Sequence, residues 1–153
     1  VGLCVARALA GRLNSPEITV MEASVSGLDI LDLLVGYKRA IIIDAIQTKG
    51  GQPGQIYRLE WGTFAATRHS ANPHSFDFAT VLELGKMLGL ALPGELVIFG
   101  IDVDEVNSFS EECTPPVAAA IPACVEMVLQ ELATRGGENS PPFPLLTKSG
   151  QEN

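Results

Sequence analysis

The chain has 153 residues, 46% of them apolar, so it can bury one full hydrophobic core but is too short for us to expect two. Eighteen acidic and ten basic side chains give a net charge of −8. That charge repels a phosphate backbone and argues against DNA or RNA as a partner.

We expect neither a membrane span nor a secretion signal. No run approaches the roughly 18 consecutive apolar residues of a membrane helix, and the N-terminus does not read as a secretion signal. Cys4, Cys113 and Cys124 are odd in number and show no CxxC spacing, which is typical of unpaired thiols in a reducing compartment. We therefore expect a soluble, cytoplasmic protein without a membrane partner.

The first third of the chain alternates helical and extended patterns. An apolar helical pattern opens at Val1 and ends near Asn14, with no capping residue before it, so we expect that an upstream segment has been lost. Residues 18–23 predict a short strand. A second helix is expected to begin at Ser26 with a capping box and to end at Gly36.

Two strands buried on both faces are predicted further along, at residues 40–43 and 96–101, because each is an unbroken apolar run. Between them, residues 56–60 alternate as an edge strand does, and a helix is expected from about Phe76 to Leu88. Residues 102–113 predict an acidic loop. The last helix begins at Pro115, and Pro122 should kink it or delay its regular part.

The order of these elements predicts an α/β fold, with an open, mostly parallel sheet, helices on both faces and the first strand missing. Residues 1–135 form the expected single domain. Residues 136–153 are polar and rich in proline, so we expect a disordered tail.

Candidate site residues follow from the rule that ligands bind at the carboxyl ends of the strands in such sheets. The rule selects Glu22, Asp44, and Asp102 with Asp104. Asp44 directly follows the central apolar run, where rigid backbone can hold a metal ligand or a general base. A carboxylate that only caps the following turn is an equally good interpretation of this position. The acidic run that begins at Asp102 is more typical of a solvated loop.

Two histidines precede the predicted helix at residues 76–88. A neutral imidazole binds nickel or zinc, and Pro73 fixes the backbone before His74, although a lone loop histidine is more often a surface residue. His69 ranks well below His74. Nucleophile and phosphate-loop motifs such as GxSxG and HExxH are absent from the sequence.

The chain resembles the hydrogenase maturation proteases in an ordered set of segments that covers residues 1 to about 134. The set is specific and consists of VGLCVARAL, EASVSGLDILDLL, RAIIIDAI, SANPHSF, IFGIDVDEV and EECTPPVAAAIP. The resemblance implies an endopeptidase that recognises nickel already inserted in a hydrogenase large-subunit precursor and then removes the precursor's C-terminal extension.

The resemblance also implies the site residues. In that family a carboxylate at the end of the central strand and a histidine before the next helix bind metal, and these correspond to Asp44 and His74. A third acidic ligand lies in an N-terminal signature that should end just before Val1. The resemblance therefore implies that this chain lacks both that ligand and the strand that carries it, and that its site is incomplete.

Two alternatives remain open from the sequence. One is a nonenzymatic metal-sensing or assembly module that binds the same precursor without cutting it. The other is a small-molecule enzyme on a similar α/β sheet.

Overall fold

The computed structural model describes residues 1–23, 28–60, 73–104, 113–134 and 143–148, and for 73–78 and 143–148 it describes the backbone. The elements of these residues are α1 (Gly2–Ala10), β1 (Ile18–Ala23), α2 (Asp29–Leu34), β2 (Arg39–Ile46), β3 (Ile56–Glu60), α4 (Pro73–Met87), β4 (Glu95–Asp102), α5 (Pro115–Thr134) and β5 (Phe143–Lys148). Every element predicted from the sequence is present and in the predicted order, and β5 is additional.

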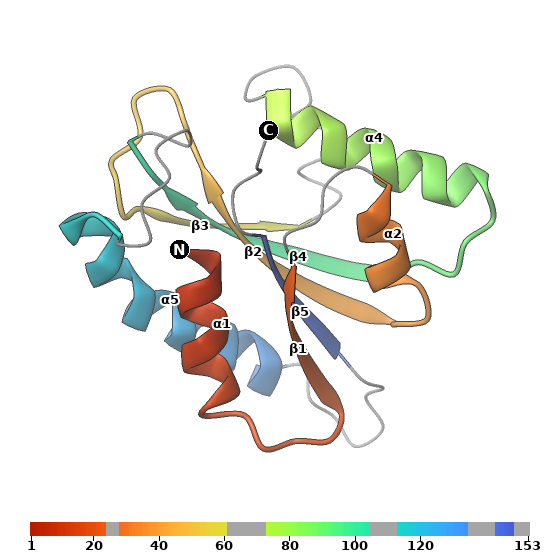
Figure 1. The fold of residues 1–153 in the computed structure, drawn as a ribbon, viewed down its shortest axis with the longest axis horizontal. Helices are drawn as coiled ribbons and strands as arrows, with labels where there is room; N and C mark the ends of the chain where they lie inside the picture. The colour runs from red at the N-terminus through yellow and green to blue at the C-terminus, as the bar shows by residue number, and fades with distance from the viewer. Residues whose placement is uncertain (24–27, 61–72, 105–112, 135–142, 149–153) are drawn as a thin grey trace.

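The sheet is open and mixed, with the strand order β1-β5-β2-β4-β3. Neighbours run parallel from β1 to β4, whereas β3 pairs with β4 in the antiparallel direction and forms one edge. This arrangement confirms the predicted α/β sheet and the edge position of residues 56–60. The carboxyl ends of the parallel strands share one end of the molecule (Figure 1).

Helices cover both faces of the sheet, with α1 and α5 on one face and α2 and α4 on the other (Figure 1). Successive side chains of β2 therefore enter different cores. Ile41 and Ile43 pack in the core beneath α1 and α5, and Ala40 and Ile42 pack in the core beneath α2 and α4. This two-sided burial is the reason that the strand lacks a polar face.

Strand β5 lies inside the sheet, between β1 and β2. The sequence predicts a disordered tail for these residues, so that prediction is wrong for 143–148. Pro144 argues against an interior strand in the sequence, because proline cannot donate a backbone hydrogen bond. The register resolves this conflict, since Pro144 lies opposite Thr19 of β1 and pairing with β2 begins one residue later, at Leu145.

Helix boundaries differ from the predictions by a few residues. Helix α1 ends at Ala10 rather than near Asn14, and α4 begins at Pro73 rather than at Phe76. The end predicted at Gly36 is confirmed, because α2 stops at Leu34 and Gly36 follows with a positive φ of 89°. The predicted cap at Ser26 lies outside the described residues.

Helix α5 runs without a break through Pro122. It is also long and apolar enough in composition to cross a membrane. Its buried side chains, among them Val117, Cys124 and Val128, nevertheless pack in the same core as β2 and β4. We therefore interpret α5 as a core helix.

Candidate functional site

Asp44 lies near the carboxyl end of β2, opposite Gly100 of β4. Alternation along the strand directs its half-buried side chain to the same face as Ile42, which is the face that α2 and α4 cover. Its Oδ1 accepts a hydrogen bond of 2.9 Å from the backbone N–H of Ala45. The carboxylate is therefore held on a rigid strand, close to the strand's end.

His74 is the second residue of α4, so its backbone belongs to the first turn of a helix and not to the loop expected from the sequence. The N-terminal end of α4 points to the end of the molecule where the parallel strands finish (Figure 1). Asp44 and the backbone of His74 thus belong to the same face and the same end of the sheet. His69 lies outside the described residues.

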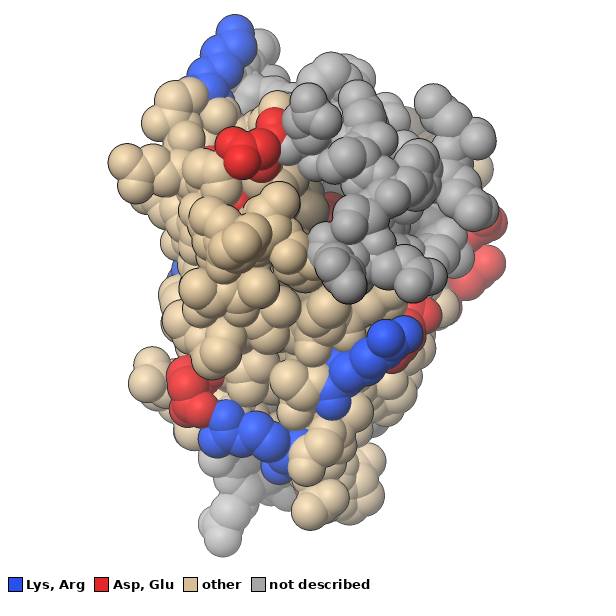
Figure 2. Space-filling model, turned by 60° about the vertical axis from the view of Figure 1, so that its left-hand side comes forward, with Lys and Arg blue, Asp and Glu red and all other residues tan. Residues whose placement is uncertain are grey.

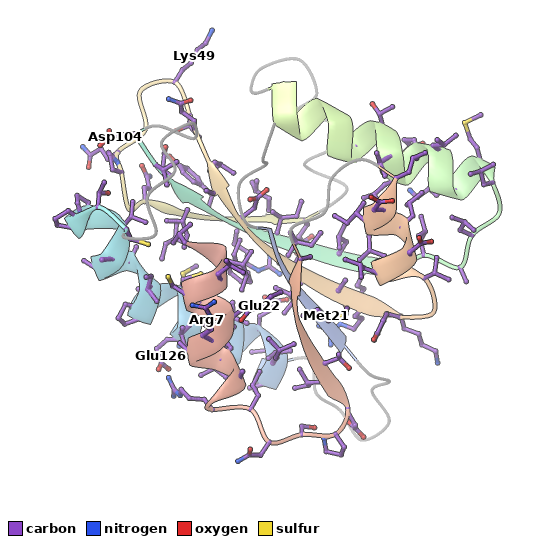
Figure 3. All side chains as sticks on the ribbon, viewed as in Figure 1. Arg7, Met21, Glu22, Lys49, Asp104 and Glu126 are labelled. Atoms are coloured by element: carbon purple, nitrogen blue, oxygen red, sulfur yellow. The ribbon has the colours of Figure 1, made fainter. Side chains whose placement is uncertain are left out.

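Glu22 does not join this site. It is exposed on β1 and forms an ion pair with Arg7 of α1, with 3.3 Å between Glu22 Oε1 and Arg7 Nε. Figure 3 shows both side chains beside α1. Asp104 is exposed as well, and its backbone oxygen accepts a hydrogen bond of 2.8 Å from Gln47 Nε2.

The prediction that Asp102 begins a solvated acidic loop is wrong. Asp102 is the last residue of β4 and is only 3% exposed. Its Oδ2 accepts a hydrogen bond from the hydroxyl of Thr48, and its Oδ1 lies 3.4 Å from the backbone N–H of Thr48. A run of acidic residues favours a solvated loop at this point, and no local pattern indicates the threonine partner. Asp102 therefore has a structural role in holding the segment that follows β2.

The side chains that the structure describes do not complete a metal site. Among them, no three of His, Cys, Asp and Glu converge as a ligand set. The imidazole of His74 and residues 105–112 fall outside that part of the chain. On the face drawn in Figure 2, the described Lys and Arg side chains lie in separate places and form no basic stripe that a nucleic acid could follow.

Comparison with curated proteins shows related sequences over most of the chain. The "Hydrogenase 2 maturation protease" of Escherichia coli strain K12 is 27% identical over 143 residues, which cover 92% of this chain and 86% of the relative. The "Hydrogenase expression/formation protein HupD" of Bradyrhizobium diazoefficiens is 26% identical over 78% of this chain, and the match spans 62% of that relative's length.

Solved structures show the same fold. The "hydrogenase maturating endopeptidase HybD from E. coli" superposes with a TM-score of 0.72 at 26% identity, covering 91% of this chain and 86% of the other. A second similar structure, the "solution structure of an endopeptidase from Escherichia coli", gives a TM-score of 0.71 at 27% identity, with coverage of 91% and 86%.

A family model described as "Hydrogenase maturation protease" matches residues 3–131, a range that includes Asp44 and His74. This range runs from α1 to the last turns of α5. Together with the shared sheet and helix arrangement, the match confirms the resemblance first noted in the sequence. The chain belongs to the hydrogenase maturation protease family.

Proposed function

We propose that this protein is an endopeptidase that removes the C-terminal extension of a hydrogenase large-subunit precursor, with Asp44 and His74 as the metal-binding residues of its site. Membership of the family supports the reaction. The observation that supports the two residues is their shared location, since Asp44 near the end of β2 faces the layer that contains the first turn of α4, to which His74 belongs.

In this proposal the metal is nickel, and it arrives as part of the substrate. A carboxylate oxygen and a neutral imidazole nitrogen are both donor types that bind a borderline divalent cation. The hydrogen bond from Ala45 fixes one oxygen of Asp44 and so limits the orientation of the carboxylate. Binding of the precursor's nickel by these two side chains would hold the adjacent peptide bond in one place relative to the protein.

Positioning is the main contribution that the described residues can make to peptide cleavage. An orientation fixed by two side chains on packed secondary structure lowers the entropic cost of reaching the transition state. A substrate cation beside the bond can also polarise its carbonyl group or a water molecule. No covalent nucleophile is needed, in agreement with the absence of the common nucleophile motifs from the sequence. We place this reaction in the cytoplasm.

The experiment that tests the proposal compares single variants of the full-length protein in release of the C-terminal peptide from nickel-loaded precursor. Asp44→Ala and His74→Ala should each lower release by about 100-fold or more, because each variant removes a side chain that orients the metal. His69→Ala is the matched control and should leave release within about twofold. Wild-type rates for Asp44→Ala and His74→Ala, in folded protein, would refute the assignment of the site.

A further inference from the structure

The loop that joins β2 to β3, residues 47–55, forms the wall of a surface hollow of ≈ 560 Å³. Glycine, proline and glutamine line it, at Gly50, Gln52, Pro53, Gly54 and Gln55. We call residues 47–55 the β2–β3 loop. It begins three residues after Asp44, at the carboxyl end of the sheet where the proposed site lies.

Hydrogen bonds anchor the β2–β3 loop to the end of β4 and to Asp104 just beyond it. The backbone N–H of Gly54 donates to the oxygen of Asp102 at 2.8 Å, and the N–H of Asp102 donates to the oxygen of Gln55 at 2.8 Å. The hydroxyl of Thr48 donates to the Asp102 carboxylate. The side chain of Gln47 donates to the backbone oxygen of Asp104. Both ends of the loop are therefore fixed to one strand.

Two glycines allow the loop to lie close to its neighbours. A Cβ at Gly51 would lie 1.8 Å from Asp102 Oδ2, and a Cβ at Gly54 would lie 2.4 Å from the backbone oxygen of Pro116 in α5. Gly54 also has a φ of +87°, which other residues rarely adopt. The loop is thus held against β4 and the first turn of α5, so the described side of the hollow is built on fixed backbone.

The described part of the lining fits a polypeptide backbone better than a charged ligand. A glutamine amide both donates and accepts hydrogen bonds, as a peptide group does, and the exposed Gly50 leaves its own backbone accessible. The five lining residues that the structure describes are uncharged. Lys49 belongs to the same loop but stands out from it, away from the strands (Figure 3).

We infer that the β2–β3 loop binds the backbone of the precursor segment beside the cleaved bond, with Gln52 and Gln55 making the contacts and Asp102 acting as a positioning residue through Thr48. This inference rests on the proposed function, because the bound segment is that of the same substrate. It assigns recognition of the peptide to the loop and binding of the metal to Asp44 and His74.

The test is steady-state cleavage of nickel-loaded precursor by full-length variants, with kcat and KM measured separately. Gln52→Ala and Gln55→Ala each remove a neutral hydrogen-bonding group, so we expect KM to rise about 3- to 10-fold and kcat to stay within about twofold. Gln130→Ala, an exposed glutamine on α5, is the matched control and should change neither value.

A second pair of variants tests the anchor. Thr48→Val keeps the shape of the side chain but removes the hydroxyl that binds Asp102, so KM should rise by a similar factor. Thr48→Ser retains the hydroxyl and should restore KM. Unfolding temperatures of both variants show whether the loop or the whole protein has changed.

Failure of this inference can be separated from failure of the proposed function. If Asp44→Ala abolishes cleavage while Gln52→Ala and Gln55→Ala leave KM unchanged, the loop does not bind the substrate and the inference is overturned. A fall in kcat at unchanged KM in the glutamine variants would overturn it as well. If Asp44→Ala cleaves at the wild-type rate, the proposed site itself is wrong.

Discussion

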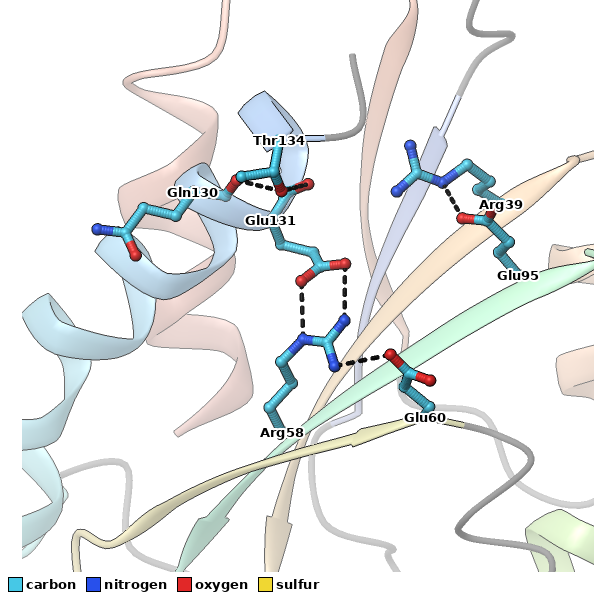
Figure 4. Close-up of polar contacts among 7 residues, drawn as sticks. All are labelled: Arg39, Arg58, Glu60, Glu95, Gln130, Glu131 and Thr134. Carbon is cyan, nitrogen blue, oxygen red and sulfur yellow. Dashed lines mark hydrogen bonds and ion pairs between the residues drawn. The ribbon is translucent and has the colours of Figure 1, made fainter. Parts of the chain in front are cut away.

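Arg58 of β3 binds Glu131 of α5 through two hydrogen bonds, one of 2.8 Å from Nε to Oε2 and one of 3.0 Å from Nη2 to Oε1 (Figure 4). Glu131 is buried, at 8% exposure, and a third bond of 3.0 Å joins Arg58 to Glu60. The hydrogen bond with Glu131 is the main cause that raises the pKa of Arg58 above its ordinary value. The pair joins the edge strand of the sheet to the helix that covers it.

Replacing Arg58 should destabilise the protein more than replacing an exposed cation. Arg58→Ala leaves the buried Glu131 carboxylate without its bidentate partner, and we expect a loss of about 1–3 kcal/mol in the free energy of unfolding. Lys86→Ala is the control, because Lys86 and Glu83 are both about half exposed and 3.8 Å apart, and should cost roughly 0–0.5 kcal/mol. Equal losses in urea denaturation would contradict this role for the pair.

The position of β5 predicts a strong effect of truncation. A chain that ends at residue 142 lacks β5, which leaves the facing edges of β1 and β2 without a partner. It should unfold at a lower temperature and self-associate in size-exclusion chromatography. A chain that ends at residue 148 keeps β5 and is the matched control. If the chain ending at 142 melts like the full chain and stays monomeric, β5 contributes nothing to the sheet.

Cys4 on α1 and Cys113 just before α5 should form a disulfide when the protein is oxidised. Their sulfur atoms lie 4.0 Å apart, so a shift of about 2 Å reaches bonding distance. Hydrogen peroxide would take two electrons and two protons from the two thiols and become two water molecules, while the S–S bond forms. Burial raises the pKa of Cys113, so the thiolate is scarce at neutral pH and the reaction should be slower than at an exposed thiol.

Peptide mapping by mass spectrometry checks this prediction. The expected product is one cross-linked peptide that joins Cys4 to Cys113, which Cys4→Ser abolishes. Cys124→Ser should have no effect on it, because Cys124 is fully buried. Cross-links between different molecules, or a cross-link that includes Cys124, would show that the two sulfurs do not face each other in solution.

The buried thiol of Cys124 should make the folded protein less stable at alkaline pH. Burial raises the pKa of its thiol from 9.0 to about 11, so the folded state keeps a proton that the unfolded chain has lost. The stabilisation is therefore complete below pH 9 and disappears as the pH rises to about 11. The shift corresponds to roughly 2–3 kcal/mol.

A comparison with Cys124→Ala isolates this contribution from other groups that titrate in the same range. The difference in unfolding free energy between wild type and variant should be constant below pH 9 and should shift in the variant's favour between pH 9 and 11. A difference that stays constant up to pH 11 would mean that the thiol is accessible to water in the folded protein.

Most of the fold follows from local patterns in the sequence. Residues 40–43 and 96–101 are apolar on both faces because helices cover both faces of β2 and β4. This two-sided burial is visible in the sequence as an unbroken apolar run. Local sequence does not predict β5, because its position depends on distant partners, and Pro144 and the polar flanks favour a disordered tail. Helix ends differ from the predictions by a few residues, as at Pro73, because helix ends fray and their terminal residues carry only a weak local signal.

The candidate site was predictable in one respect and not in another. Asp44 could be placed near the end of a central strand because a polar residue after four apolar ones is a local signal. The burial of Asp102 could not be predicted, since it depends on Thr48, which is 54 residues away in the chain. The Arg58–Glu131 pair spans 73 residues and has no local signal either.

The most direct test of the central proposal is mass spectrometry of the peptide released when the full-length protein is incubated with hydrogenase large-subunit precursor, in parallel with and without nickel. The proposal predicts release of the C-terminal extension from the nickel-loaded precursor and none from the nickel-free precursor, because the substrate's metal is what Asp44 and His74 bind. Equal release from both forms would contradict recognition through the metal. Release from neither form would contradict the proposed endopeptidase activity.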